Sequence, residues 1–265
     1  MVVIPREICR IAESALAHEW QVSNRHGSYA AATIAGALTR RSHGLLVAEL
    51  KPHGRTVMLA KLDEEIEVEG HLYKFGTNEY QPNIISPDGF LYLQQVVLDG
   101  NLTRFDYQVG GVELTKTIWM DPDHSTTYIR YTLAEHSSPV QLTLLPLCDY
   151  RSTENLTHGS ESWHFQIESE PSGFRVTAYA GAMPYRILTQ PTAEFIPLDL
   201  WYWRFQLRAD EHQVTDLYVP GLVRTTLAPG ASLTVIATCE IGELAAFHPD
   251  RALERAATLS NSTSS

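Results

Sequence analysis

Hydrophobic residues that alternate with polar ones constrain the fold of this 265-residue chain more than any other feature. Two such runs, 104–109 and 112–120, are separated only by Gly110 and Gly111. A two-residue glycine link is typical of a tight hairpin, because glycine takes positive φ at both turn positions without steric cost. The sequence therefore predicts an antiparallel strand pair over 104–120.

The same period of two recurs along most of the chain. Residues 201–208 place apolar side chains at the odd positions, which predicts a half-buried strand. Pro229-Gly230 then predicts a turn into a strand near Leu233. Many short strands with frequent turn signals indicate an antiparallel sandwich, either as one large all-β domain or as two small ones. Further strands are predicted near 126–133, 140–147, 163–169 and 174–180.

Only the two ends of the chain depart from this pattern. Residues 5–17 carry an apolar stripe at helical spacing, which predicts a short helix. Residues 244–257 are rich in Ala, Leu, Glu and Arg and predict a second helix, after which the chain turns polar and loses any core pattern. We therefore expect an N-terminal helix over 1–18, a β domain over 19–242, and a linker with a disordered tail over 243–265.

Composition excludes several classes of partner. A net charge of −11 argues against nucleic acid, because phosphate contacts need clustered Lys and Arg. The three cysteines show no CxxC spacing, which favours reduced thiols in a reducing compartment. The sequence contains neither a signal peptide nor a run of about 20 apolar residues that would span a membrane. We expect a cytoplasmic protein that binds neither nucleic acid nor membrane.

Motifs for metal, nucleophile and phosphate chemistry are missing from the sequence. The eleven histidines show no HxxxH pattern, so we expect no metal site. GxSxG, GxxxxGK and GxGxxG are also absent, so we predict no nucleophilic serine and no nucleotide cofactor. Glycoside hydrolysis would require two carboxyl groups about 5–10 Å apart, and sequence spacing cannot single out such a pair in a β fold. The candidate acids are Asp63, Glu64, Glu65, Glu79, Asp88 and Asp149.

The stretch from Glu19 to Asp63 carries the densest group of polar side chains. Residues 39–44 hold two guanidinium groups, an imidazole and two hydroxyls ahead of an apolar run. Planar polar side chains held in a loop between buried elements suit a sugar or an acidic ligand, and they would equally suit an interface with another domain. The candidate contact residues here are Asn24, Tyr29, Thr39, Arg40, Arg41 and His43.

Two further groups of candidates lie downstream. Lys61 and Asp63 share one face at the end of an alternating run, either as a solvated ion pair at an exposed strand end or as a pair that orients a loop or ligand. Asn78 and Tyr80 follow Gly76-Thr77 and form the most ligand-like aromatic and amide group. Sugars stack their C–H faces on aromatic rings while amides and charged groups bond their hydroxyls.

Residues 19–48 resemble a family signature. They read EWQVSNRHGSYAAATIAGALTRRSHGLLVA, which is similar to the N-terminal domain of prokaryotic glycogen debranching enzymes of the amylo-α-1,6-glucosidase type. Further matching stretches include GRTVMLAKLDEEI, TNEY, FDYQVGGVELTKTIWM and DLYVPGLVRTTLAPG, so the resemblance extends from about Glu19 to Glu240.

The resemblance implies a large antiparallel β supersandwich, of the galactose-mutarotase-like kind, that precedes a catalytic (α/α)6 barrel. This chain would then be the non-catalytic N-terminal domain of an α-glucan debranching glycoside hydrolase. It would pack on the barrel and contact α-1,4/α-1,6-glucan through the signature residues. The alternatives are a stand-alone carbohydrate-binding module, which needs a platform of exposed Trp or Tyr, and a mutarotase-like epimerase, which needs His and Glu converging in a cleft.

Overall fold

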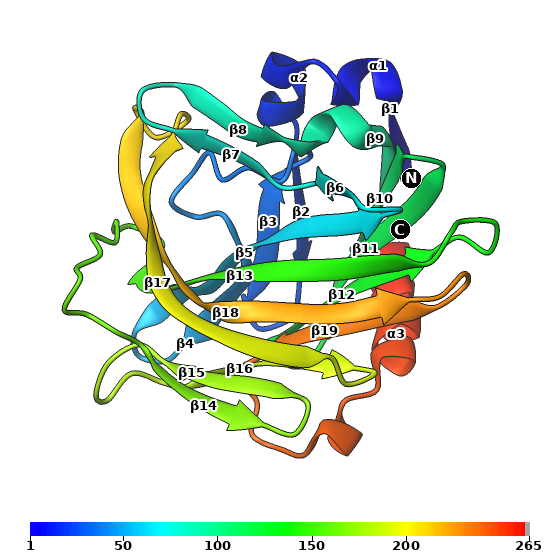
Figure 1. The fold of residues 1–265 in the computed structure, drawn as a ribbon. Helices are drawn as coiled ribbons and strands as arrows, with labels where there is room; N and C mark the ends of the chain where they lie inside the picture. Colours follow the sequence, from blue (N-terminus) through cyan, green and yellow to red (C-terminus); the bar gives the residue numbers. More distant parts are fainter. Residues whose placement is uncertain (263–265) are drawn as a thin grey trace.

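The structure is a computed structural model that describes residues 1–262. Two large antiparallel sheets face each other and form a sandwich (Figure 1), which confirms the all-β supersandwich prediction. The first sheet has nine strands in the order β1-β9-β10-β11-β12-β19-β16-β15-β14. Its strands are β1 (Val2–Pro5), β9 (Leu93–Asp99), β10 (Leu102–Val109), β11 (Val112–Met120), β12 (Thr126–Leu133), β14 (Gln166–Glu170), β15 (Gly173–Thr177), β16 (Tyr185–Gln190) and β19 (Ser232–Thr238).

The second sheet has ten strands, nine of them in the order β2-β3-β4-β5-β13-β18-β17-β7-β8, with β6 paired to β5. Its strands are β2 (Glu19–Ser23), β3 (Tyr29–Thr33), β4 (Gly44–Leu50), β5 (Gly54–Val68), β6 (His71–Lys74), β7 (Thr77–Tyr80), β8 (Ile84–Asp88), β13 (Val140–Ser152), β17 (Glu194–Leu207) and β18 (Gln213–Leu227). A 3-10 helix, η1 (Gly89–Tyr92), links the two sheets.

The main hydrophobic core lies between the sheets. Ile118 and Ile129 enter it from the first sheet, and Met58 and Leu142 enter it from the second; all four are fully buried. Burial of each such side chain contributes about 1.5–3 kcal/mol. A smaller apolar cluster covers the outer face of the second sheet, where Leu38 packs from the loop before β4.

The predicted glycine hairpin is confirmed. Val109 of β10 pairs with Val112 of β11, and Gly110 and Gly111 take φ of 56° and 77°. The strand predicted over 201–208 forms the end of β17, but its alternation is interrupted. The pairing with β18 shifts register between Tyr202 and Phe205, which places Trp203 at 43% exposure instead of in the core. A bulge of this kind puts an extra residue on one strand and reverses the faces beyond it.

The N-terminal segment differs from the single predicted helix. It forms strand β1, then helix α1 (Arg6–Cys9), then helix α2 (Ala12–Ala17). Ile11 lies between the helices in an extended conformation and is 56% exposed, so the predicted apolar stripe is broken there. β1 pairs with β9, and the first residues of the chain therefore belong to the first sheet.

The C-terminal helix is where the sequence predicts it. A 3-10 helix, η2 (Leu244–Ala246), precedes α3 (Pro249–Ser262), and α3 packs on the outer face of the first sheet (Figure 1). The helix extends to Ser262, into the tail that the sequence predicts to be disordered. The last residues of that tail, 263–265, lie outside the described residues. No helix within residues 1–262 has the length and apolar character needed to cross a bilayer.

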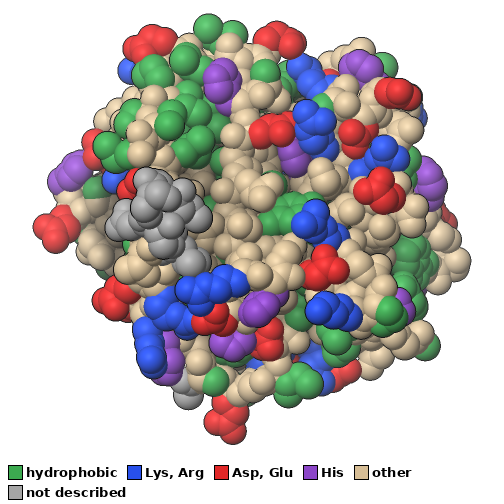
Figure 2. Space-filling model, turned by 180° about the vertical axis from the view of Figure 1, so that it is seen from behind, with side chains coloured by type: hydrophobic (Ala, Val, Ile, Leu, Met, Phe, Trp, Pro, Cys, Tyr) green, Lys and Arg blue, Asp and Glu red, His purple; other side chains and the backbone are tan. Residues whose placement is uncertain are grey.

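One group of exposed hydrophobic side chains lies at the N-terminal end. Val2, Val3 and Ile11 are each about half exposed or more. Figure 2 shows hydrophobic side chains gathered at the upper left of the rear face, which is the side where the N-terminal helices lie after the rotation from Figure 1. Over the rest of that face, charged side chains of both signs are interspersed.

Candidate functional site

Several of the predicted contact residues line one open hollow of about 510 Å³ on the second sheet. β2 and β3 form its floor, and the loop before β4 forms its rim. We call this hollow the signature pocket. It is lined by Glu19, Trp20, Gln21, Ser23, Asn24, Gly27, Tyr29, Ala31, Arg40, Ser42, His43 and Arg55.

Glu19 holds the cationic side of the signature pocket in place. Arg40 Nε donates to Glu19 Oε1 at 2.7 Å, and His43 Nε2 lies 3.7 Å from the same oxygen. The Arg40 side chain lines the pocket and is 46% exposed, so its other guanidinium N–H groups are accessible to a ligand. Glu19 was not among the predicted residues, because a carboxylate twenty-one positions before Arg40 gives no local signal of this contact.

His43 is buried behind Arg40 and is neutral at physiological pH. Its Nδ1 accepts the Thr39 N–H at 3.2 Å, so the neutral ring carries its hydrogen on Nε2, toward Glu19. Burial lowers the pKa of His43 to about 4, although the Glu19 carboxylate acts in the opposite direction. His43 therefore serves as a fixed hydrogen-bonding group of the rim and adds no positive charge to the pocket.

Asn24 and Tyr29 shape the opposite wall through contacts to backbone. Asn24 Oδ1 accepts the N–H groups of His26 at 2.8 Å and Ser28 at 3.0 Å, which fixes the turn between β2 and β3. The Tyr29 hydroxyl donates to Ser42 O at 2.7 Å and ties β3 to the loop before β4. Burial raises the pKa of Tyr29, so the hydroxyl remains a donor.

Arg41 and Thr39 anchor the loop and do not line the signature pocket. The Arg41 backbone N–H and Nε donate to Asp210 Oδ2 at 2.6 and 3.3 Å, and its Nη1 donates to Glu154 O at 3.1 Å. Thr39 is buried, and its carbonyl accepts the Ala209 N–H at 3.0 Å. The predicted loop residues thus divide into two that face the pocket, Arg40 and His43, and two that hold the loop on the sheet.

Lys61, Asp63 and Asn78 form a buried cluster and not an exposed strand end. The Lys61 side chain is 4% exposed and its Nζ lies 2.7 Å from Asp63 Oδ1. Lys61 Nζ also donates to Thr77 O at 2.7 Å, and Asn78 Nδ2 donates to Asp63 Oδ2 at 2.6 Å. The interpretation as a solvated ion pair is wrong, because β7 covers this part of β5. The cluster does not line the signature pocket.

The remaining candidate acids are also held by partners inside the fold or lie at its surface. Glu79 next to Tyr80 receives two bonds from Arg208, at 2.6 and 3.1 Å. Tyr80 itself packs against Phe205. Among the described residues, Glu19 is the one carboxylate that lines the signature pocket. Of the other candidates, Glu64 bonds Lys116 and Tyr131, Asp149 bonds Arg151 and Thr157, Glu65 pairs with Lys74 at the surface, and Asp88 is exposed.

No group of three or more His, Cys, Asp or Glu side chains suited to a metal ion occurs in the part of the chain that the structure describes. The three cysteines are free thiols. The chemistry that the signature pocket offers is hydrogen bonding from planar, oppositely charged side chains, with donors on Arg40 and acceptors on Glu19. Such a surface suits a neutral polyhydroxyl ligand or the polar surface of another domain.

Comparison with known proteins identifies one family. A model of the family described as glycogen debranching enzyme N terminal matches residues 18–234. No curated protein matches the chain. A bacterial glucoamylase complexed with acarbose is similar over 90% of this chain and 33% of that chain, with 7% identity and a TM-score of 0.43. A polysaccharide lyase is similar over 66% of this chain and 24% of that chain, with 14% identity and a TM-score of 0.31. This chain thus spans a third or less of either protein, and at these TM-scores neither similarity carries an argument about function.

Proposed function

The chain belongs to the glycogen debranching enzyme N-terminal family, and from that premise we propose that it is a non-catalytic domain of an α-glucan debranching glycoside hydrolase. In this proposal the domain packs on a catalytic (α/α)6 barrel and contacts α-glucan through the signature pocket in the cytoplasm. One observation carries the glucan contact. Asn24, Tyr29, Arg40 and His43, four residues of the family signature, line one open polar pocket although they come from three different segments.

The pocket chemistry supports a sugar as the ligand. Arg40 and Glu19 present a donor and an acceptor side by side, and glucose hydroxyls can both donate and accept. The contacts of Asn24 and Tyr29 to backbone hold the walls in place before any ligand arrives, which reduces the ordering cost of binding. The volume of about 510 Å³ falls within the range of small-ligand sites, roughly 300–1,000 Å³.

A calorimetric titration with a branched maltooligosaccharide, with an assay for glucose in the same mixture, tests the glucan contact. We expect binding without release of glucose. Arg40→Ala should weaken this binding at least about tenfold, because two or more charged hydrogen bonds are lost. The matched control is Arg104→Ala, which removes a guanidinium of similar exposure (48%) from an ion pair on β10. Equal affinity of Arg40→Ala and wild type would contradict the glucan contact, and release of glucose would contradict a non-catalytic role.

The proposed interface with a barrel has its own test. We expect a catalytic barrel of the same family to lose activity on branched glucan, or to become insoluble, when it is expressed without the domain described here. Restoration of activity by adding this chain in trans would support the interface. Full activity of the barrel alone would contradict the proposal that the domain is required.

A further inference from the structure

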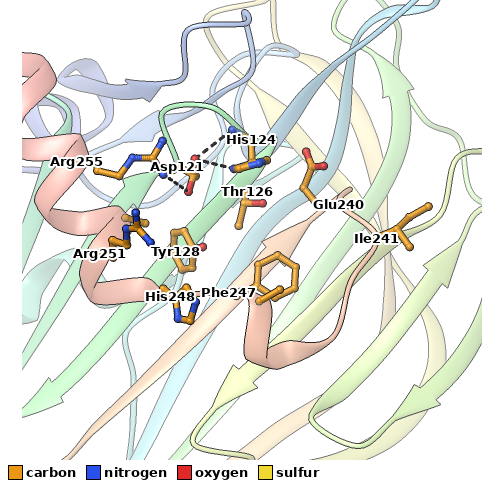
Figure 3. Close-up of a pocket in the computed structure, with 12 residues that line it drawn as sticks. Asp121, His124, Thr126, Tyr128, Glu240, Ile241, Phe247, His248, Arg251 and Arg255 are labelled. Atoms are coloured by element: carbon orange, nitrogen blue, oxygen red, sulfur yellow. Dashed lines mark hydrogen bonds and ion pairs between the residues drawn. The ribbon is translucent and has the colours of Figure 1, made fainter.

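A second hollow, of about 340 Å³, lies between α3 and the outer face of the first sheet (Figure 3). Tyr128 of β12 and Phe247 supply its aromatic surface, and Glu240 closes the end that follows β19. Arg251 enters it from the first turn of α3. We call this hollow the α3 pocket. It shares no lining residue with the signature pocket.

The Tyr128 hydroxyl is the least explained polar group of the α3 pocket. The residue is 2% exposed, and its ring stacks on Trp119 with centroids 5.4 Å apart. The neighbouring Thr126 hydroxyl is paired with Thr238 at 2.6 Å, whereas the Tyr128 hydroxyl has no hydrogen-bond partner among the described residues. The ring is buried, but the hydroxyl oxygen keeps accessible surface, so water or a ligand in the pocket can accept its hydrogen. Burial also raises the pKa of Tyr128, so the hydroxyl keeps its hydrogen and can donate it. Tyr128 lines the pocket, where a ligand can accept this hydrogen.

The charges around the α3 pocket favour a neutral ligand. Arg251 and His248 are exposed and have no ion-pair partner within residues 1–262. Arg255 is already held by Asp121 and Asp123. A phosphate ligand would meet the carboxylates of Asp121 and Glu240 as well as Arg251, and like charges repel. A polyhydroxyl ligand can instead donate to a carboxylate and accept from a guanidinium at the same time.

Two further hollows lie beyond Glu240. Glu240 also lines a neighbouring hollow of about 480 Å³, together with Lys51, His53 and Tyr150. His53 and Tyr150 then line a third hollow, of about 330 Å³, which ends at Tyr179. Tyr179 is 52% exposed and meets Tyr150 edge to face, with ring centroids 5.4 Å apart. These three hollows adjoin one another through the wall residues that they share, and we call them together the α3–Tyr179 groove.

We infer that the α3–Tyr179 groove binds a linear oligosaccharide, separately from the signature pocket. One sugar unit occupies the α3 pocket, where its hydroxyls bond the Tyr128 hydroxyl, Arg251 and Glu240. The following sugar units of the oligosaccharide pass Glu240 and lie against the ring of Tyr179. The exposed ring of Tyr179 packs on the C–H face of a sugar, and the polar residues of the groove bond hydroxyls. The choice of α-linked glucose as the sugar rests on the proposed function.

Calorimetric titration with maltose and with maltoheptaose tests the groove. We expect maltoheptaose to bind at least about tenfold more tightly than maltose, because only the longer chain reaches both ends. Arg251→Gln at one end and Tyr179→Ala at the other should each weaken maltoheptaose about tenfold. Arg6→Gln is the matched control, since Arg6 is also an exposed helical arginine without an ion pair in the described chain, and it should leave the affinity unchanged.

Tyr128→Phe tests the same pocket without changing the charge of the protein. It removes a hydroxyl without orphaning a partner, so the folded domain should be at least as stable as wild type in urea. Its affinity for maltoheptaose should nevertheless fall about fivefold to tenfold, because the hydroxyl is assigned to the ligand. Unchanged affinity in Tyr128→Phe would contradict the placement of a sugar unit in the α3 pocket.

The Arg40→Ala background separates this inference from the proposed function. Maltoheptaose binding that survives Arg40→Ala and is lost on adding Arg251→Gln would support the groove. Complete loss with Arg40→Ala alone would overturn the groove and leave the signature pocket as the glucan site. Loss with Arg251→Gln and Tyr179→Ala but not with Arg40→Ala would support the groove and overturn the signature pocket. A wild-type chain that binds no maltoheptaose would overturn the groove.

Discussion

Two ion pairs with the same separation have opposite roles in the molecule. Arg40 and Glu19 lie at the rim of the signature pocket and are 46% and 36% exposed. Lys61 and Asp63 form an ion pair of the same separation, 2.7 Å, but are only 4% and 11% exposed. The first pair leaves N–H groups and a carboxylate open to a ligand. The second pair directs its hydrogen-bonding groups to Thr77 and Asn78.

The difference lies in which element covers each pair. β7 lies over Lys61 and Asp63 and places Asn78 within bonding distance of both. No comparable strand among the described residues covers Arg40, because the loop before β4 lies at the edge of the signature pocket. A charged pair that is covered contributes to the fold, and one that is uncovered is available for recognition.

Lys61→Met should have the largest effect on stability. It leaves the Asp63 carboxylate buried without its cation, which costs about 3–5 kcal/mol. Lys74→Met is the control, because Lys74 pairs with Glu65 at the surface and its loss should cost under about 1 kcal/mol. Urea unfolding of the two variants measures both values. Similar losses would mean that the Lys61 cluster is not the buried structural unit described here.

His43→Asn should remove an acid-dependent loss of stability. The pKa of His43 is about 4 in the folded chain, below the ordinary value of 6.5, so the unfolded state binds more protons in this range. Stability is therefore full above about pH 6.5 and falls as the pH drops toward 4, by up to about 3 kcal/mol. The asparagine side chain would still offer an oxygen that accepts the Thr39 N–H, but it would not take up a proton between pH 6.5 and 4. His26→Asn is the control, because His26 is exposed. The free energy of unfolding of this variant, measured in urea, should depend on pH as that of the wild type does.

Arg40→Ala should have the smallest effect on stability and a large effect on affinity. The Arg40–Glu19 pair is half exposed, so its loss should change the free energy of unfolding by under about 1 kcal/mol. The same change should weaken branched maltooligosaccharide at least about tenfold. A loss of several kcal/mol in urea unfolding would place Arg40 with Lys61 as a structural residue and remove the contrast.

The hairpin at Gly110-Gly111 and the strands that follow could be predicted because their signals are local. The turn needs positive φ at two successive positions, and only the residues themselves determine that. The bulge at Trp203 could not be predicted, since it depends on the register of β17 against β18 and not on the alternation of β17 alone. Ile11 likewise separates two helices through packing that its helical spacing does not reveal.

The candidate site was predictable only in part for a related reason. Asn24, Tyr29, Arg40 and His43 were found because they lie in one dense polar stretch. Asp210, which anchors Arg41, lies 169 residues away, and no local pattern connects the two. The burial of Lys61 depends on β7, a strand that pairs with β8 and β17 and not with β5. Contacts between sheets or between distant loops do not affect the local pattern of apolar and polar residues, so this pattern cannot predict them.

Amide hydrogen exchange with and without a branched maltooligosaccharide tests the contrast between the two groups most directly. Residues in the loop before β4 and in the turn between β2 and β3 should exchange more slowly when the saccharide is bound. Residues 61–63 and 77–80 should be strongly protected in both states, because they are already buried and bonded. Slowing confined to 77–80, with no change at 24–29 and 40–43, would contradict the assignment of recognition to the signature pocket.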